Sequence, residues 1–154
     1  MLEVFLDSAY AIALSAPTDQ YHRQAVILAE RLEAEGTRLI TTWAVVLEIG
    51  NALAKLRYRQ AAIELLAALE EDPTVEIIPI SDQLYARARR FYQERPDKEW
   101  GMTDCISFIV MQDRGLTEAD HCESVRSNTA GRRVGCGCLV IFPLALSNRG
   151  QRKD

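Results

Sequence analysis

The chain has 154 residues, 48% of them hydrophobic, which suffices for the core of one globular domain without covalent cross-links. Its formal net charge of −4 argues against a simple nucleic-acid-binding module, because such modules hold the phosphate backbone with a basic surface. No apolar run approaches the roughly 20 residues of a membrane span, and no secretory signal opens the chain, so we expect a cytoplasmic protein that contacts no membrane.

Short apolar runs alternate with amphipathic segments over most of the sequence. In chain order, the predicted elements are strand 4–6, helix 9–14, helix 21–35, strand 38–41, helix 43–56, helix 60–69, strand 75–78, helix 82–93 and helix 104–113. Gly36 is expected to stop a helix, and Thr42, Ser81 and Thr103 to cap helix starts. Strands that alternate with helices imply an α/β fold with a parallel sheet.

Three acidic residues stand where such a sheet gathers functional side chains. Asp7 follows the first predicted strand, Glu48 lies in an apolar stretch of the third helix, and Asp104 stands at the start of the last helix. Converging carboxylates repel one another unless a cation neutralises them, so the pattern predicts a Mg²⁺ site, with Mn²⁺ as the other ion. Each acid alone is at least as consistent with an ordinary turn or helix-surface residue.

Three segments resemble the acid-bearing motifs of a known family. FLDSAYAIAL (5–14), TTWAVVLEIGNAL (41–53) and WGMTDCISFIVMQDRGLTEA (100–119) are similar, in order and spacing, to the motifs of PIN-domain ribonucleases of the VapC-toxin type. The resemblance covers residues 1–119 and implies a three-layer α/β/α nuclease domain with a central parallel sheet. It also implies a homodimeric toxin that cleaves structured RNA and is inhibited by a cognate antitoxin.

The resemblance assigns roles to individual residues. Asp7 and Asp104 would bind the metal ion most directly, and Glu48 would complete the acidic pocket. The polar side chains implied to support these ligands are Ser8 and Thr103, while Asn51 is either a further polar contact or an ordinary helix residue.

After residue 119 the sequence departs from the family's pattern. The net charge changes from −8 over residues 1–120 to +4 over residues 121–154. The family's fourth acidic or amide position is lost or displaced, with Asp120 and Glu123 as doubtful substitutes. Read one base later, residues 119–125 and 129–132 permit the family's missing residues. Our hypothesis is therefore that 120–154 is a divergent tail, either frameshifted or disordered. We expect the loss of the strand it replaced to lower stability unless residues 139–142 fill the gap.

Other polar residues give weaker signals. His22 and His121 match no spacing of a nucleophilic hydrolase, and Arg87, Arg89 and Arg90 read as a solvated helix face more readily than as an RNA contact. Cys105 and Met111 are expected in the core, and we expect all four cysteines to be free thiols; the other three are Cys122, Cys136 and Cys138.

Two alternatives to an active ribonuclease stay open. The first is a catalytically impaired PIN-domain remnant that only binds an antitoxin or another partner, and the altered tail favours it. The second is a phosphatase or small-molecule phosphotransferase that uses the same acids, which the lack of a Gly-rich phosphate loop disfavours.

Overall fold

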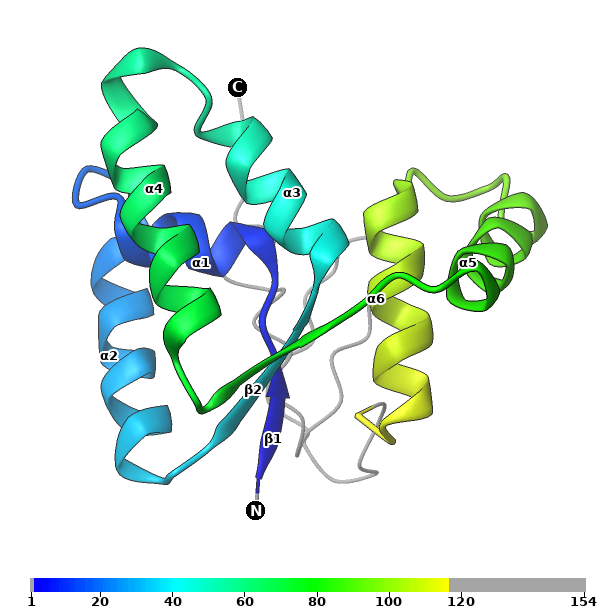
Figure 1. Ribbon diagram of the computed structural model, residues 1–154, viewed down its shortest axis with the longest axis horizontal. Coiled ribbons are helices and arrows are strands. Elements are labelled where there is room, and N and C mark those ends of the chain that lie inside the picture. The colour runs from blue at the N-terminus through cyan, green and yellow to red at the C-terminus, as the bar shows by residue number, and fades with distance from the viewer. Residues whose placement is uncertain (1, 117–154) are drawn as a thin grey trace, which may run out of the picture.

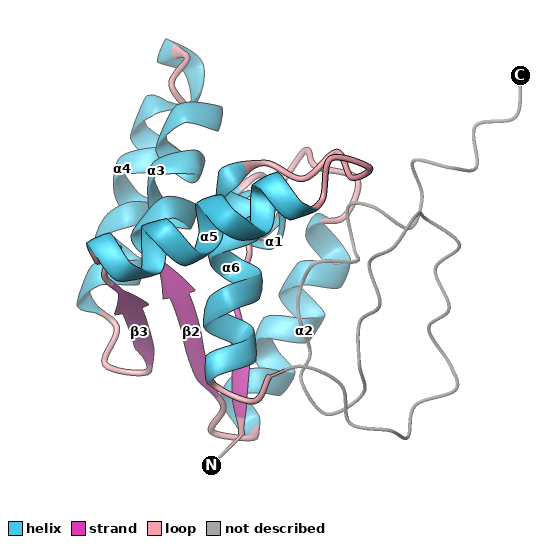
Figure 2. Cartoon of the chain, turned by 90° about the vertical axis from the view of Figure 1, so that its right-hand side faces the viewer, coloured by secondary structure: helices cyan, strands magenta, loops and turns pink. Residues whose placement is uncertain are grey.

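The computed structural model describes residues 2–116, which form a three-stranded parallel sheet with helices on both faces (Figures 1 and 2). In chain order, the elements are β1 Glu3–Phe5, α1 Ser8–Ser15, α2 His22–Ala34, β2 Arg38–Thr42, α3 Trp43–Ala52, α4 Leu56–Glu71, β3 Val75–Ile78, α5 Asp82–Glu94 and α6 Met102–Asp113. The predicted α/β architecture with a central parallel sheet is confirmed.

The sheet has the order β1-β2-β3, with Glu3 opposite Arg38 and Leu39 opposite Val75. Helices α1, α2 and α4 lie on one side of it, and α6 lies on the other side with α5 packed outside (Figure 1).

Beyond the end of β1, the Leu6 N–H donates to the Ile40 carbonyl at 2.8 Å, and the Leu6 carbonyl accepts from the Thr41 hydroxyl at 2.9 Å. These bonds hold the chain at the sheet edge immediately before Asp7.

The core explains why the apolar runs became these elements. Val4 and Phe5 are fully buried in β1, and Tyr10 of α1 packs on the same side as α2, where its hydroxyl donates to the Ala25 carbonyl at 3.1 Å. From the other side, α6 contributes a nearly continuous buried surface that includes Cys105 and Met111. The expectation that these two sulfur-containing residues belong to the core is confirmed.

Local capping signals correctly located the starts of α3 and α5 and the end of α2. Thr42 and Ser81 accept backbone N–H bonds from Val45 at 3.2 Å and Leu84 at 3.0 Å, and Gly36 ends α2 with a φ of +62°, which favours glycine. The prediction for Thr103 was wrong. Helix α6 starts two residues earlier than predicted, at Met102, because Gly101 takes the cap position and its N–H donates to the Asp104 carboxylate.

The α3–α4 boundary also differs from the prediction. Helix α3 ends at Ala52 and α4 already begins at Leu56, whereas the apolar pattern placed the break between residues 56 and 60. The Leu56 side chain is 91% exposed, so its apolar character misled the pattern. The turn is closed instead by the Arg59 guanidinium, which donates to the Ala54 carbonyl at 2.7 Å.

Several predictions concern residues outside the described range. The divergent tail 120–154, the substitute acids Asp120 and Glu123, the domain boundary after 119 and the strand replacement at 139–142 all lie there. Within residues 2–116, no helix combines the length and apolar character needed to cross a membrane.

Candidate active site

The three acids come from three elements that meet at one end of the sheet. Asp7 joins the end of β1 to the start of α1, Glu48 lies on α3, and Asp104 lies in the first turn of α6. Figure 1 shows the starts of α1, α3 and α6 at the end where the strands finish, and α3 packs against both other helices. The topology therefore brings the predicted acids to one region.

Asp7 has the most unusual environment of the three. Its side chain is buried, with 7% of the residue exposed. Loss of hydration raises the pKa of Asp7 to about 6, the backbone N–H groups of Ser8 and Ala9 oppose that rise, and the negative charges of Glu48 and Asp104 add to it. Among the described groups that shift this pKa none is a cation, so ionised Asp7 is buried beside two like charges.

The structure brings Ser8 directly to one of the acids. Its hydroxyl donates to Oε2 of Glu48 at 2.8 Å, which joins the first turn of α1 to the middle of α3. Glu48 itself is exposed, so this bond limits the rotamers of a side chain that solvent alone would leave mobile. Ser8 thus orients Glu48 toward the Asp7 side of the site.

Asp104 is oriented by the loop that precedes α6. The N–H of Gly101 donates to Oδ2 of Asp104 at 2.9 Å. The neighbouring Trp100 ring stacks on Phe91 of α5 with centroids 5.7 Å apart, and it meets Phe108 of α6 edge-on at 4.9 Å. This aromatic cluster, which our sequence reasoning missed, fixes the loop that holds the Asp104 carboxylate. The available signal was the recurrence of aromatic residues at Phe91, Trp100 and Phe108, on both sides of the loop.

Thr103 and Asn51 are less informative. Thr103 is half-buried beside Asp104, and its backbone carbonyl accepts a bond from the Ser107 hydroxyl at 2.8 Å. Asn51 is exposed three residues after Glu48, near the end of α3. Their roles as supports of a metal ligand remain predictions.

The sequence matches a model of a known protein family. The model for the PIN domain matches residues 4–125, which is most of the chain. The chain belongs to the PIN-domain family. This PIN domain has the fold of VapC20 from Mycobacterium tuberculosis, a toxin that cleaves the sarcin–ricin loop: the two are 24% identical, with a TM-score of 0.63 over 73% of this chain and 83% of that one. No curated protein matches the sequence significantly.

The acids of this PIN domain suit a hydrated divalent ion better than an enclosed one. Within residues 2–116, no group of three His, Cys, Asp or Glu side chains is arranged to hold a metal ion. The negative charges of Glu48 and Asp104 nevertheless both raise the pKa of Asp7, so both lie near enough to act on its buried carboxyl group. Mg²⁺ commonly keeps several waters and binds through one or two carboxylates, so a buried carboxylate without a cation fits its chemistry.

Proposed function

We propose that this PIN domain is a divalent-metal-dependent endoribonuclease of the VapC-toxin type that cleaves structured RNA in the cytoplasm. The observation that carries the proposal is the environment of Asp7, a buried carboxylate whose charged neighbours are the carboxylates of Glu48 and Asp104. An arrangement that raises the energy of its own ionised form is costly, and it becomes favourable once a cation enters. We therefore assign these three acids to a Mg²⁺ or Mn²⁺ site.

Each residue has a distinct task in this proposal. Asp7 and Asp104 hold the ion, and Glu48 adds the third negative charge that favours a divalent cation over water. Ser8 keeps Glu48 turned toward the site, and the Gly101 N–H keeps Asp104 in place at the start of α6. The bound ion supplies a Lewis acid that activates water and stabilises charge on the phosphodiester.

Exposed apolar side chains support protein partners as well. Trp43 and Leu47 are 38% and 63% exposed, and they lie one helical turn apart on α3, beside Glu48. Burying these apolar side chains against a protein partner would remove them from water, which is favourable. The position of these side chains therefore fits the proposed homodimer and a cognate antitoxin that covers the acidic site.

The direct test is cleavage of a pooled tRNA and rRNA preparation by purified protein with Mg²⁺. Mixtures with EDTA in place of Mg²⁺ and the variant Asp7→Asn should show no cleavage above background. The matched control is Asp97→Asn, because that acid is exposed in the α5–α6 loop and its variant should cleave like the wild type. Cleavage that survives EDTA or the Asp7 change would contradict the assigned site.

A non-catalytic remnant is the second candidate. The lack of a complete ligand group within residues 2–116 favours it, because a site short of one ligand can lose its ion. Mn²⁺ binding by calorimetry separates the two proposals without an activity assay. Folded protein that binds Mn²⁺ and cleaves RNA supports the nuclease, whereas folded protein that does neither supports the remnant.

A further inference from the structure

Helix α5 carries two different surfaces. Its apolar face, with Leu84 and Ala88 buried, packs on α6 and belongs to the core. On the adjoining flank, Tyr85 and Tyr92 are 50% and 49% exposed, and Arg89 lies between them at the i+4 and i−3 positions. These three residues, which we call the α5 stripe, alternate aromatic rings with a guanidinium along one line of the helix.

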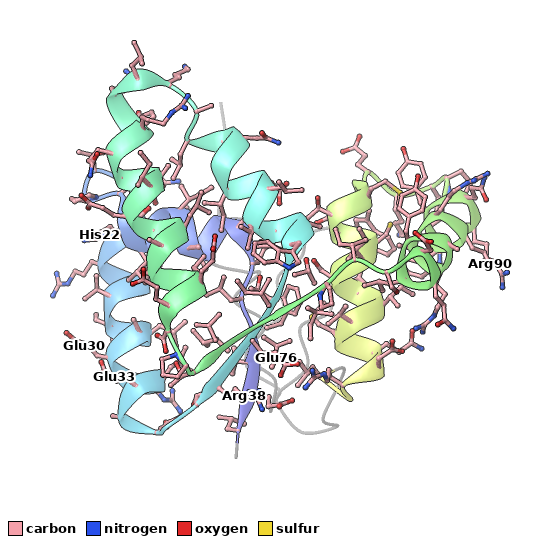
Figure 3. All side chains as sticks on the ribbon, in the orientation of Figure 1. His22, Glu30, Glu33, Arg38, Glu76 and Arg90 are labelled. Atoms are coloured by element: carbon pink, nitrogen blue, oxygen red, sulfur yellow. The ribbon has the colours of Figure 1, made fainter. Side chains whose placement is uncertain are left out.

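The charge of α5 differs from that of the rest of the domain. Residues 2–116 contain 12 Lys and Arg against 18 Asp and Glu, yet α5 has three arginines against two acids and is the only described helix with a net positive charge. Asp113 takes up one arginine, since both its carboxylate oxygens accept from Arg87 at 2.6 and 2.8 Å. Within the described residues, no hydrogen bond or ion pair engages the side chain of Arg89 or Arg90, and Figure 3 shows Arg90 pointing away from the body.

The stripe ends close to the acidic site. Tyr92 directly follows Phe91, whose ring stacks on Trp100. The residue after Trp100 is Gly101, whose N–H is bonded to the Asp104 carboxylate. One aromatic layer and a short loop thus separate the last turn of α5 from an acid of the proposed metal site. A polymer held at the acids would reach α5 over the start of α6 and the loop that precedes it (Figure 1).

We propose that the α5 stripe binds unpaired nucleotides of the RNA substrate that flank the cleavage point. The proposal rests on the ribonuclease function given above and adds a preference for a single-stranded segment. Exposed bases stack on tyrosine rings, and an arginine between the rings can pair with the phosphate that joins two bases. A paired stem offers no free base faces, so the stripe selects the strand next to a stem.

A second copy of the chain fits this surface less well. In a two-fold symmetric dimer centred on the α5 stripe, Arg89 would face the partner's Arg89, and like charges held together in an interface are unfavourable. RNA has the opposite charge to Arg89, and its bases match the rings on either side. Charge and shape together favour the nucleic acid.

The test measures RNA binding apart from cleavage. The Asp7→Asn chain in EDTA is titrated against a fluorescein-labelled single strand and against a perfectly paired duplex of equal length. Tyr85→Ala or Tyr92→Ala, each introduced into the Asp7→Asn chain, should weaken single-strand binding about tenfold. Arg89→Ala should reduce the salt dependence of the binding constant by the equivalent of about one phosphate contact. The matched controls are Ile63→Ala on α4, which is 54% exposed, and Arg23→Ala on α2, and neither should change binding.

Three results would overturn the inference. If the single strand binds and the tyrosine variants bind it equally well, RNA binding stands and the stripe is excluded. If no RNA binds to any form and the wild type cleaves none, the proposed function fails together with the stripe. If the double tyrosine variant lowers the mass seen in sedimentation, the stripe is a contact between copies.

Discussion

The two ends of the sheet differ in how their charged side chains are arranged. At the end where the strands begin, charges of both signs alternate and pair across three strands and α6. At the end where the strands finish, Asp7, Glu48 and Asp104 are all negative. The paired end compensates its charges internally, whereas Asp7 at the acidic end is a buried carboxylate, and no cation is among the described groups that shift its pKa. Paired charges mark a structural cluster, and a buried carboxylate such as Asp7 that no described cation approaches marks a candidate functional one.

The paired end shows what compensation requires. Arg38 of β2 meets Glu76 of β3 at 2.9 Å, and Figure 3 shows the two side chains at the lower part of the sheet. Arg114, just after α6, pairs with the same Glu76 and reaches Glu3 of β1 at 3.6 Å. The network joins the last turn of α6 to β1 and β3, and so holds the helix whose first turn carries Asp104.

The change with the largest expected effect on stability is Asp7→Asn, measured by denaturant unfolding without metal. Burial raises the pKa of Asp7 from 3.8 to about 6, so the folded protein binds the proton more tightly than the unfolded chain does. Wild-type stability should therefore fall as pH rises from about 4 to about 6, and above that Asp7→Asn should be more stable by roughly 3 kcal/mol. If the stability of Asp7→Asn depends on pH as that of the wild type does, ionised Asp7 does not destabilise the folded protein.

The paired end should respond in the opposite direction. Arg114→Ala leaves Glu3 and Glu76 close together without their shared cation, and we expect a loss of about 1 to 2 kcal/mol, between the values of exposed and buried ion pairs. The control is Arg31→Ala, which breaks an exposed pair with Glu35 on α2 and should cost less than about 0.5 kcal/mol. Equal losses of stability in the two variants would mean that the Arg114 network contributes no more than an exposed ion pair does.

The smallest expected effect concerns Ser8→Ala, which tests how tightly the acidic end is ordered. Loss of the bond to Glu48 should cost about 1 kcal/mol of stability and weaken Mn²⁺ affinity about tenfold in calorimetry. Ser15→Ala on the same helix is the control, because its hydroxyl bonds only to the Ile12 carbonyl. If both changes leave the affinity unaltered, Glu48 needs no support from Ser8.

Local chemistry explains which parts of the fold were predictable. Strand β3 has the predicted bounds, Val75–Ile78, because a short β-branched run between Asp72-Pro73 and Pro79 allows little else. The break between α3 and α4 was misplaced, because exposed Leu56 looks apolar in the sequence and only packing shows which side of a helix is covered. The Thr103 cap failed because Gly101 takes the cap position and its N–H is bonded to the Asp104 carboxylate, so the helix begins before Thr103.

The sequence by itself determined the alternation of strands and helices and the family, and it predicted the three acids, because apolar periodicity and motif spacing are properties of neighbouring residues. Only the tertiary structure decided which charges are paired and which are left alone. Glu76 lies in β3 and Asp7 directly follows β1, but Arg38 and Arg114 reach the first and no described cation reaches the second. That difference depends on contacts between residues more than 30 positions apart, which no local pattern encodes.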